Sequence, residues 1–383
     1  MTPESQPRRA PRGVTAAEFA AAGLYDPAAP NAADRLGLLE WFVEQGLSLE
    51  QMVHGLRDGA LTGLAADLAL RPGERLRLEE LATELDMRAE HIQRIRLAAG
   101  LPPAEPDAPV FTPDDAAILR AFQVGAELFG QPFVLPFARV VGSALARIAE
   151  ATIALYLVNV ERPLVEASAR ELALAQANLE AMRSLKSIPP VLEALFRAHL
   201  ANAIRRSRRA RARAGSDLAQ MTVGFVDLVG FTPLSRQLSS QELGALVDRF
   251  ETQANDITTA RDGRLVKIIG DEVMFVAVDA AAACDIALTL VDRFRADASV
   301  MPRGGLATGT LLMRGGDYYG PVVNLASRLA DLAVPREVLV TTEVVAEAGA
   351  DGLCFEPAGK RMLKGFDEAV TLYAAGRALA APQ

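Results

Sequence analysis

The chain has 383 residues, of which 50% are hydrophobic and 23% charged, and its formal net charge is −8. Such a chain can build two globular domains, and it is too apolar to be disordered throughout. The acidic balance argues against binding nucleic acid through overall surface charge. The two cysteines, Cys284 and Cys354, lie in no metal-ligand spacing and allow at most one bridge, so we expect a reducing, cytoplasmic location.

The N-terminal half is predicted to be helical. Residues 1–33 are rich in Ala, Pro and Gly and are expected to form a flexible tail without a signal peptide. From residue 34 to residue 204, apolar side chains recur at helical spacing and no strand pattern is found, which predicts a helical domain.

The most membrane-like stretch, residues 133–160, lies within this helical domain. Arg139, Arg147 and Glu150 interrupt it, and the uncharged runs between them are too short to cross a bilayer. We therefore interpret the stretch as a buried helix and expect no transmembrane segment, with a membrane-spanning helix as the alternative.

The pattern from Leu78 to Leu97 predicts two short helices around Asp86-Met87, and the segment from Leu78 to Leu101 allows two interpretations. The second helix offers basic and amide side chains, so one interpretation is a DNA-reading helix-turn-helix; these side chains are Arg88, His91, Gln93, Arg94 and Arg96. A helical hairpin that packs into its own domain is the favoured interpretation, and no specific nucleic-acid partner is expected.

The character of the sequence changes after residue 204. Residues 205–216 contain six arginines and no acidic residue until Asp217, and we interpret them as a basic linker with a solvated helix face. From 217 to 377, short β-branched runs alternate with amphipathic helices, which predicts an α+β domain. Within it, Ser239 and Glu242 predict a helix start, and residues 264–278 predict a hairpin turning at Gly270-Asp271.

The first motif of this domain is Phe225-Val226-Asp227-Leu228-Val229-Gly230-Phe231-Thr232. Strand alternation places Asp227 at a strand end, and Gly230 permits a tight turn. Backbone N–H groups of Gly230, Phe231 and Thr232 can form a concavity that binds phosphates. A carboxylate beside it can hold Mg²⁺, although an Asp in such a turn is by itself more often a turn former.

Two further motifs carry charged side chains. Lys267-Ile268-Ile269-Gly270-Asp271 puts a cation and a second carboxylate on one hairpin. In the segment from Asp317 to Arg328, Pro321 suits the first turn of a helix. Asn324 and Arg328 then lie four residues apart, so they project from the same helix face.

Together these residues resemble the class III nucleotidyl cyclases. The family uses six residues, and all six have counterparts here in chain order: Asp227, Lys267, Asp271, Asp317, Asn324 and Arg328. The stretch from Leu363 to Phe366, with Leu372-Tyr373, is similar to the family's C-terminal strand region. The resemblance implies a ferredoxin-like βαβ catalytic domain and adenylyl cyclase activity.

The resemblance also implies a role for each residue. Asp227 and Asp271 would hold two Mg²⁺ or Mn²⁺ ions per active site, with the Leu228 carbonyl as an extra ligand. Lys267 and Asp317 would read adenine, which offers an amino donor and a ring-nitrogen acceptor, and would disfavour guanine. Asn324 would orient the ribose, and Arg328 would stabilise the transition state. In the family the metal aspartates come from one chain, and the base-reading, ribose and arginine residues come from the other, so the resemblance implies a homodimer with sites at its interface.

The N-terminal half is similar in pattern to the helical regulatory domain of soluble actinobacterial class III cyclases, most clearly from Leu38 to Gly46. This similarity implies regulation, and we hypothesise autoinhibition. All three histidines precede the catalytic domain, and His199 lies just before the arginine run, so the hypothesis includes sensitivity to pH. A catalytically inactive nucleotide receptor is the alternative, and the complete six-residue set argues against it.

Overall fold

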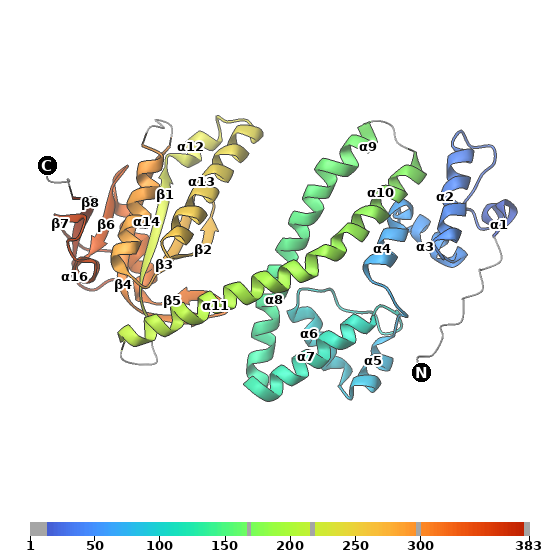
Figure 1. Ribbon diagram of the computed structural model, residues 1–383, viewed down its shortest axis with the longest axis horizontal. Coiled ribbons are helices and arrows are strands. Elements are labelled where there is room, and N and C mark those ends of the chain that lie inside the picture. Colours follow the sequence, from blue (N-terminus) through green and yellow to red (C-terminus); the bar gives the residue numbers. More distant parts are fainter. Residues whose placement is uncertain (1–13, 167–169, 215–218, 296–299, 379–383) are drawn as a thin grey trace. The chain divides into compact units, whose positions relative to one another are not determined.

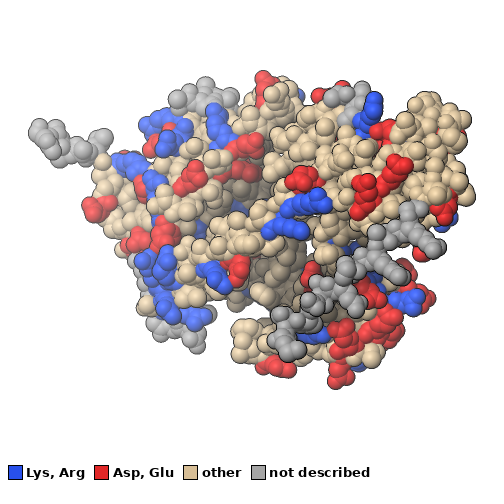
Figure 2. Space-filling model, turned by 45° about the vertical axis from the view of Figure 1, so that its right-hand side comes forward, with Lys and Arg blue, Asp and Glu red and all other residues tan. Residues whose placement is uncertain are grey.

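The computed structural model describes residues 14–166, 170–214, 219–295 and 300–378 (Figure 1). The chain divides into two compact units, residues 1–195 and 196–383. Helix α11 (Ile188–Ala214) contributes residues to both units. On the face shown in Figure 2, acidic and basic side chains are interspersed among uncharged ones, so no single basic surface covers this face.

The N-terminal unit is helical, as the spacing of its apolar residues predicts. In its described residues the sheet-type pairing is a single isolated bridge between Leu76 and Phe111. Its α-helices are α1 (Ala16–Ala21), α2 (Ala32–Glu44), α3 (Leu49–Arg57), α4 (Leu64–Leu70), α5 (Leu78–Leu85), α6 (Ala89–Ala98), α7 (Pro113–Phe129), α8 (Gln131–Tyr156), α9 (Arg162–Glu166) and α10 (Glu171–Ser184). Short 3-10 turns lie at Leu61–Gly63 and Leu185–Ser187, and a π turn lies at Leu157–Glu161.

Part of the expected flexible tail is folded. Thr15 accepts a hydrogen bond from the backbone of Glu18 and starts α1, and Phe19 of α1 is fully buried. Phe19 packs in one core with Leu38 and Phe42 of α2. The ordered structure therefore begins well before Asp34, since the capped helix α1 places Phe19 in the core of this unit.

The apolar stretch at 133–160 differs from the prediction of a buried helix. Residues 131–166 form one continuous helical run, and only 6% of its most apolar window is buried within the chain. Phe133, Phe137 and Leu155 are exposed at 65%, 57% and 66%. This run is long and apolar enough to cross a membrane, but one such helix is weak evidence for a membrane protein.

The C-terminal unit is built on a mixed sheet in the order β2-β3-β1-β4-β6-β8-β7, with β5 paired to β4. Among the described strands, β4 pairs with β6 in parallel and the other pairings are antiparallel. The strands are β1 (Ala219–Val229), β2 (Arg264–Ile269), β3 (Glu272–Ala277), β4 (Met301–Arg314), β5 (Asp317–Tyr319), β6 (Val338–Thr341), β7 (Leu353–Arg361) and β8 (Val370–Arg377). The sheet confirms the predicted α+β class and the hairpin at Gly270.

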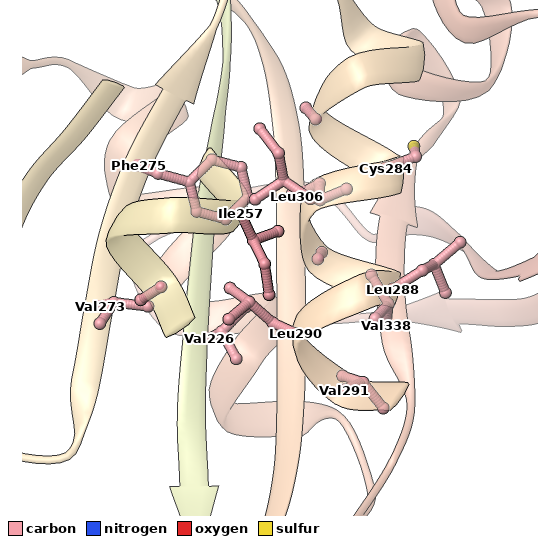
Figure 3. Close-up of a cluster of buried hydrophobic side chains, with 14 of the residues drawn as sticks. Val226, Ile257, Val273, Phe275, Cys284, Leu288, Leu290, Val291, Leu306 and Val338 are labelled. Atoms are coloured by element: carbon pink, nitrogen blue, oxygen red, sulfur yellow. The ribbon is translucent and has the colours of Figure 1, made fainter. Parts of the chain in front are cut away.

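Helices cover both faces of this sheet, and they are α12 (Phe231–Ser235), α13 (Ser240–Ala260), α14 (Ala280–Arg293), α15 (Pro321–Leu332) and α16 (Thr342–Ala348). Val226 points to the core shared with α13 and α14, where Figure 3 shows it beside Leu290. Phe225 points to the opposite face, which packs against α15, because successive strand residues alternate. Gly305 lets α15 approach closely, since a β-carbon there would lie 2.2 Å from the backbone nitrogen of Ala330.

The basic segment after residue 204 is not simply a solvated linker. It is the C-terminal part of α11, and Ala210 is fully buried in the same core as Met221 and Tyr318. Arg209 forms an ion pair with Asp262. This end of α11 therefore packs on the sheet of the C-terminal unit.

Candidate active site

The end of β1 carries the first predicted metal ligand. Asp227 is paired in register with Glu272 of β3 and with Arg303 of β4. Arg303 donates to one carboxylate oxygen, Oδ2, from Nε at 3.1 Å and from Nη2 at 2.9 Å. The same guanidinium donates to the carbonyls of Asp331 and Ala333 at the end of α15. Oδ2 is thus held in place, and Oδ1 has none of these bonds.

The second predicted metal ligand, Asp271, reaches the same place from the β2–β3 hairpin. Gly270 has a left-handed φ of 65°, which the turn requires, and the Asp271 carbonyl accepts from the Leu228 N–H at 3.2 Å. The pKa of Asp271 is raised, first by burial and then by the negative charge of Asp227, while Arg303 partly offsets this. The two carboxylates are therefore close enough to disfavour each other's charge.

Glu272 adds a third carboxylate beside this pair. Burial and the charges of Asp227, Asp331 and Asp271 raise the pKa of Glu272 to about 7. Across the described residues, no group of three or more His, Cys, Asp or Glu side chains is arranged to hold a metal ion alone. A few crowded carboxylate oxygens fit Mg²⁺ or Mn²⁺, which completes its shell with water and substrate phosphate.

A second pair of predicted residues meets between two strands that do not pair with each other, β2 and β5. The Lys267 ammonium of β2 lies 2.6 Å from Asp317 Oδ2 of β5, and Asp317 Oδ1 accepts from the Tyr318 N–H at 2.8 Å. Burial acts to raise the pKa of Asp317, but the bonds from Lys267 and Tyr318 outweigh it, so the net shift is downward. The carboxylate is therefore ionised and fixed in direction before any substrate binds.

The turn after β1 has the predicted form. Gly230 takes a left-handed φ of 81°, and α12 begins at the next residue, Phe231. Gly230 provides no side-chain cap, so the first amides of α12 are open to an acceptor. The Thr232 side chain lies outside the described side chains.

The remaining two predicted residues stand apart. Asn324 and Arg328 lie one turn apart on α15, and both are exposed. Arg328 pairs with Asp331 of its own helix at 3.2 Å. Within the described residues, neither side chain is hydrogen-bonded to the carboxylate pair or to the Lys267–Asp317 pair. One chain therefore brings the six residues together in two pairs and leaves the last two on an open helix face.

Nothing in the sequence motifs singled out Arg303 or Glu272. Both face Asp227 only through strand register, since Arg303 is 76 residues away along the chain. Arg303 stands in an ordinary strand, Met301–Arg314, so no local signal separates it from a surface arginine.

Comparison with known proteins identifies a family for both parts of the chain. Residues 216–375 match the adenylate and guanylate cyclase catalytic domain, and residues 17–204 match the adenylate cyclase regulatory domain. The pH-sensitive adenylate cyclase of Mycobacterium tuberculosis is 32% identical over 89% of this chain and 87% of its own length. The chain belongs to this adenylate cyclase family.

This adenylate cyclase is also similar to three other proteins. The adenylate cyclase of Streptomyces coelicolor is 38% identical over 63% of each chain. An uncharacterized protein of Mycobacterium tuberculosis is 34% identical over 92% of each chain. The crystal structure of the adenylyl cyclase CyaB from P. aeruginosa covers 42% of this cyclase and 95% of that chain, with 26% identity and a TM-score of 0.38. The cyclase thus combines a regulatory domain and a catalytic domain in one chain.

Proposed function

We propose that this adenylate cyclase converts ATP to 3′,5′-cyclic AMP and pyrophosphate in a homodimer whose active sites lie at the interface. The observation that supports the proposal is the separation within one chain. Asp227 and Asp271 form one half-site, while Asn324 and Arg328 lie on an exposed helix face where a second copy can meet them. A two-fold dimer would then complete two equivalent sites.

The metal half-site would be made by Asp227, Asp271 and the backbone carbonyl of Leu228. Two Mg²⁺ or Mn²⁺ ions, when bound there, would favour the ionised ribose 3′-oxygen and neutralise the phosphates. Arg303 fixes Asp227 Oδ2, which leaves Oδ1 to face an ion. The open amides of Phe231 and Thr232 would bind phosphate oxygens at the start of α12.

Substrate choice would rest on the Lys267–Asp317 pair. Asp317 can accept from the C6 amino group of adenine, and Lys267 can donate to N1. Guanine reverses both groups and would set a carboxylate against a carbonyl oxygen. Because the pair already exists in the chain, little reorganisation would be needed when ATP binds.

Asn324 and Arg328, which would face the second copy of the chain, would complete the active site. Asn324 would hold the ribose, so that the 3′-oxygen lies in line with the α-phosphorus. Arg328 would stabilise the charge that develops on the phosphoryl oxygens as pyrophosphate leaves. To reach the substrate, Arg328 would have to leave Asp331. Both groups of that ion pair are half exposed, so the pair is weak and breaking it would cost little free energy.

The dimer would also cover apolar side chains that one chain leaves open. Leu312, Met313 and Tyr319 on the β4–β5 hairpin are exposed at 58%, 42% and 50%, and they flank Asp317. In the N-terminal unit, the apolar run at 131–166 would likewise be buried against a second copy rather than in a membrane. We accordingly place the protein in the cytoplasm.

Regulation would act through α11. Its Arg206 and Ser207 line a small cavity of about 200 Å³ together with Arg264, Asp317 and Tyr318, so the helix touches the surroundings of the base-reading pair. We propose that the N-terminal domain restrains catalysis by holding this helix. Protonation of the exposed His199 on α11 would add positive charge near the arginine run and would release the restraint as pH falls.

Mixing two inactive variants tests the shared site. Asp227→Ala and Arg328→Ala should each be nearly inactive, but their heterodimer contains one intact site and one doubly damaged site. Activity should partly return on mixing. Asp227→Ala mixed with Asp271→Ala is the matched control and should stay inactive, because both changes damage the same half-site. If exchange of protomers is shown by differently tagged chains and the first mixture stays at background, the site is not shared.

A further inference from the structure

The α5–α6 hairpin lines a cavity of about 780 Å³ inside the N-terminal unit. The other walls are α7 and the beginning of α8. The volume lies in the range of roughly 300–1,000 Å³ that small-molecule sites occupy. Arg88, His91 and Arg94, which a DNA-reading helix would present to a groove, instead line this cavity. A small ligand is therefore a better match than a duplex.

Positive charge is concentrated around the cavity. Arg88, His91 and Arg94 come from the start of α6, and Arg139 comes from α8. Asp86 is the one carboxylate among the residues that line it. In the part of the chain that the structure describes, none of the three arginines takes part in an ion pair.

Other arginines of the same unit are paired within the chain. Arg71 and Arg120 bind Asp115 and Glu84 at 2.5 and 2.6 Å, and Arg96 donates to a backbone carbonyl 2.5 Å away. Among the described residues, Arg88, Arg94 and Arg139 have no such partner, and they gather around a single cavity with their side chains exposed to solvent. A ligand with negative charge would supply what they lack.

The electrostatic surroundings of His91 are also positive. Its pKa is lowered, first by burial and then by the positive charges of Arg94 and Arg88. The N-termini of α6 and α8 both lie at the cavity, and neither has a side-chain cap. Their dipoles add to the positive potential of the arginines. Phe122 of α7 and Leu135 of α8 add apolar surface to the lining.

We propose that this cavity binds a small molecule that carries phosphate groups with two or more negative charges, together with an uncharged apolar part. The three guanidinium groups carry more positive charge than the one carboxylate in the lining can neutralise. The planar N–H donors of each guanidinium match the oxygens of a phosphate. The apolar part would lie against Phe122 and Leu135. The site is separate from the cyclase active site, so the inference does not depend on the proposed mechanism.

Calorimetry on the full-length protein tests the site. Measurements are made in EDTA, so that metal-dependent binding at the active site is suppressed. Pyrophosphate should bind saturably with a Kd below about 1 mM. Phenyl phosphate should bind more tightly than inorganic phosphate, because it adds an apolar part. Arg88→Gln and Arg139→Gln should each weaken pyrophosphate binding by about tenfold or more.

Matched variants separate this site from others. Arg120→Gln removes an exposed arginine of α7 outside the cavity, and Lys267→Gln alters the active site, and neither should change the binding. Thermal unfolding checks that each variant is folded, and Arg94→Gln replaces any cavity variant that is not.

Four results would overturn the inference. The first is no saturable binding of pyrophosphate below about 1 mM. The second is a loss of pyrophosphate binding in Arg120→Gln as large as the loss in the cavity variants, or the absence of pyrophosphate binding in Lys267→Gln. The third is phenyl phosphate binding no more tightly than inorganic phosphate. The last is binding of decanoate alone, or of a random DNA duplex, with dependence on the same arginines.

Discussion

The substitution Asp317→Asn removes one negative charge from the Lys267–Asp317 pair and keeps the shape of the side chain. The two side chains are 38% and 25% exposed, so the pair contributes roughly 0–1 kcal/mol to folding. An amide oxygen can still accept the Tyr318 N–H that Asp317 Oδ1 accepts now. We therefore expect the unfolding temperature to change by no more than about 4 °C.

The effect on substrate choice should be much larger. A hydrogen bond to a charged group contributes about 1.5–3 kcal/mol, which corresponds to roughly 10- to 150-fold in kcat/KM for ATP. An amide can also turn its N–H₂ toward the O6 of guanine, so GTP should gain while ATP loses. The ratio of kcat/KM for ATP over GTP should fall by about 100-fold or more. Changing Lys267→Gln as well should lower the ratio further.

The assay is the initial rate of cyclic nucleotide formation from ATP and from GTP at saturating Mn²⁺, with thermal unfolding measured in parallel. Asp262→Asn is a matched control, because Asp262 is also an ion-paired aspartate, with Arg209, but lies outside the predicted base site. The reasoning is refuted by an unchanged ATP-to-GTP ratio in Asp317→Asn, or by wild-type protein that uses GTP as well as ATP.

Three further predictions concern metals, positioning and control. Asp227→Ala or Asp271→Ala should abolish turnover and leave the dimer intact by light scattering; more than about a tenth of wild-type activity would contradict the two-metal site. Arg303→Met should lower turnover at saturating Mn²⁺ by about tenfold or more, since the carboxylate loses the bonds that orient it, and unchanged kcat would disprove this role. Full-length activity should rise as the solution becomes more acidic. His199→Asn should flatten that rise and the exposed control His54→Asn should keep it, and identical profiles in all three proteins would exclude the switch.

Titratable groups of the catalytic domain do not affect the comparison of the activity–pH profiles of the three proteins. Asp317 has a lowered pKa, so it stays ionised throughout the histidine range and loses its charge only in stronger acid. Glu272 has a pKa of about 7 and does titrate there, but it is present in every protein of the series. Its contribution therefore cancels when the profiles are compared.

Local signals in the sequence predicted the local structure well. The hairpin turns at Gly270, the capping box at Ser239 begins α13, and Pro321 opens α15. Each of these depends on neighbours within a few residues, so the sequence pattern contains the whole cause. The pairing of Lys267 with Asp317 was predicted from the family resemblance alone, since these residues lie on different strands.

Features that depend on distant packing were not predictable in the same way. Arg303 reaches Asp227 only through the register of β1 with β4. Phe19 lies in a segment with the composition of a tail, and only the core that it enters makes that segment a helix. The stretch at 131–166 looked like a buried helix because its apolar content is high, but burial depends on what packs against it.

Helix α11 runs through the boundary between the two units without interruption from Ile188 to Ala214. A helix turns by about 100° and rises about 1.5 Å per residue. An insertion therefore changes the angle between the helix residues before and after it far more than it changes the distance between them. One residue inserted between Leu195 and Ala210 would rotate the helix residues that follow it by about 100° about the helix axis, relative to the residues before it. Seven residues complete almost two turns and restore the angle within about 20°. If the helix stays intact during signalling, regulation should depend on the phase of an insertion rather than on its size.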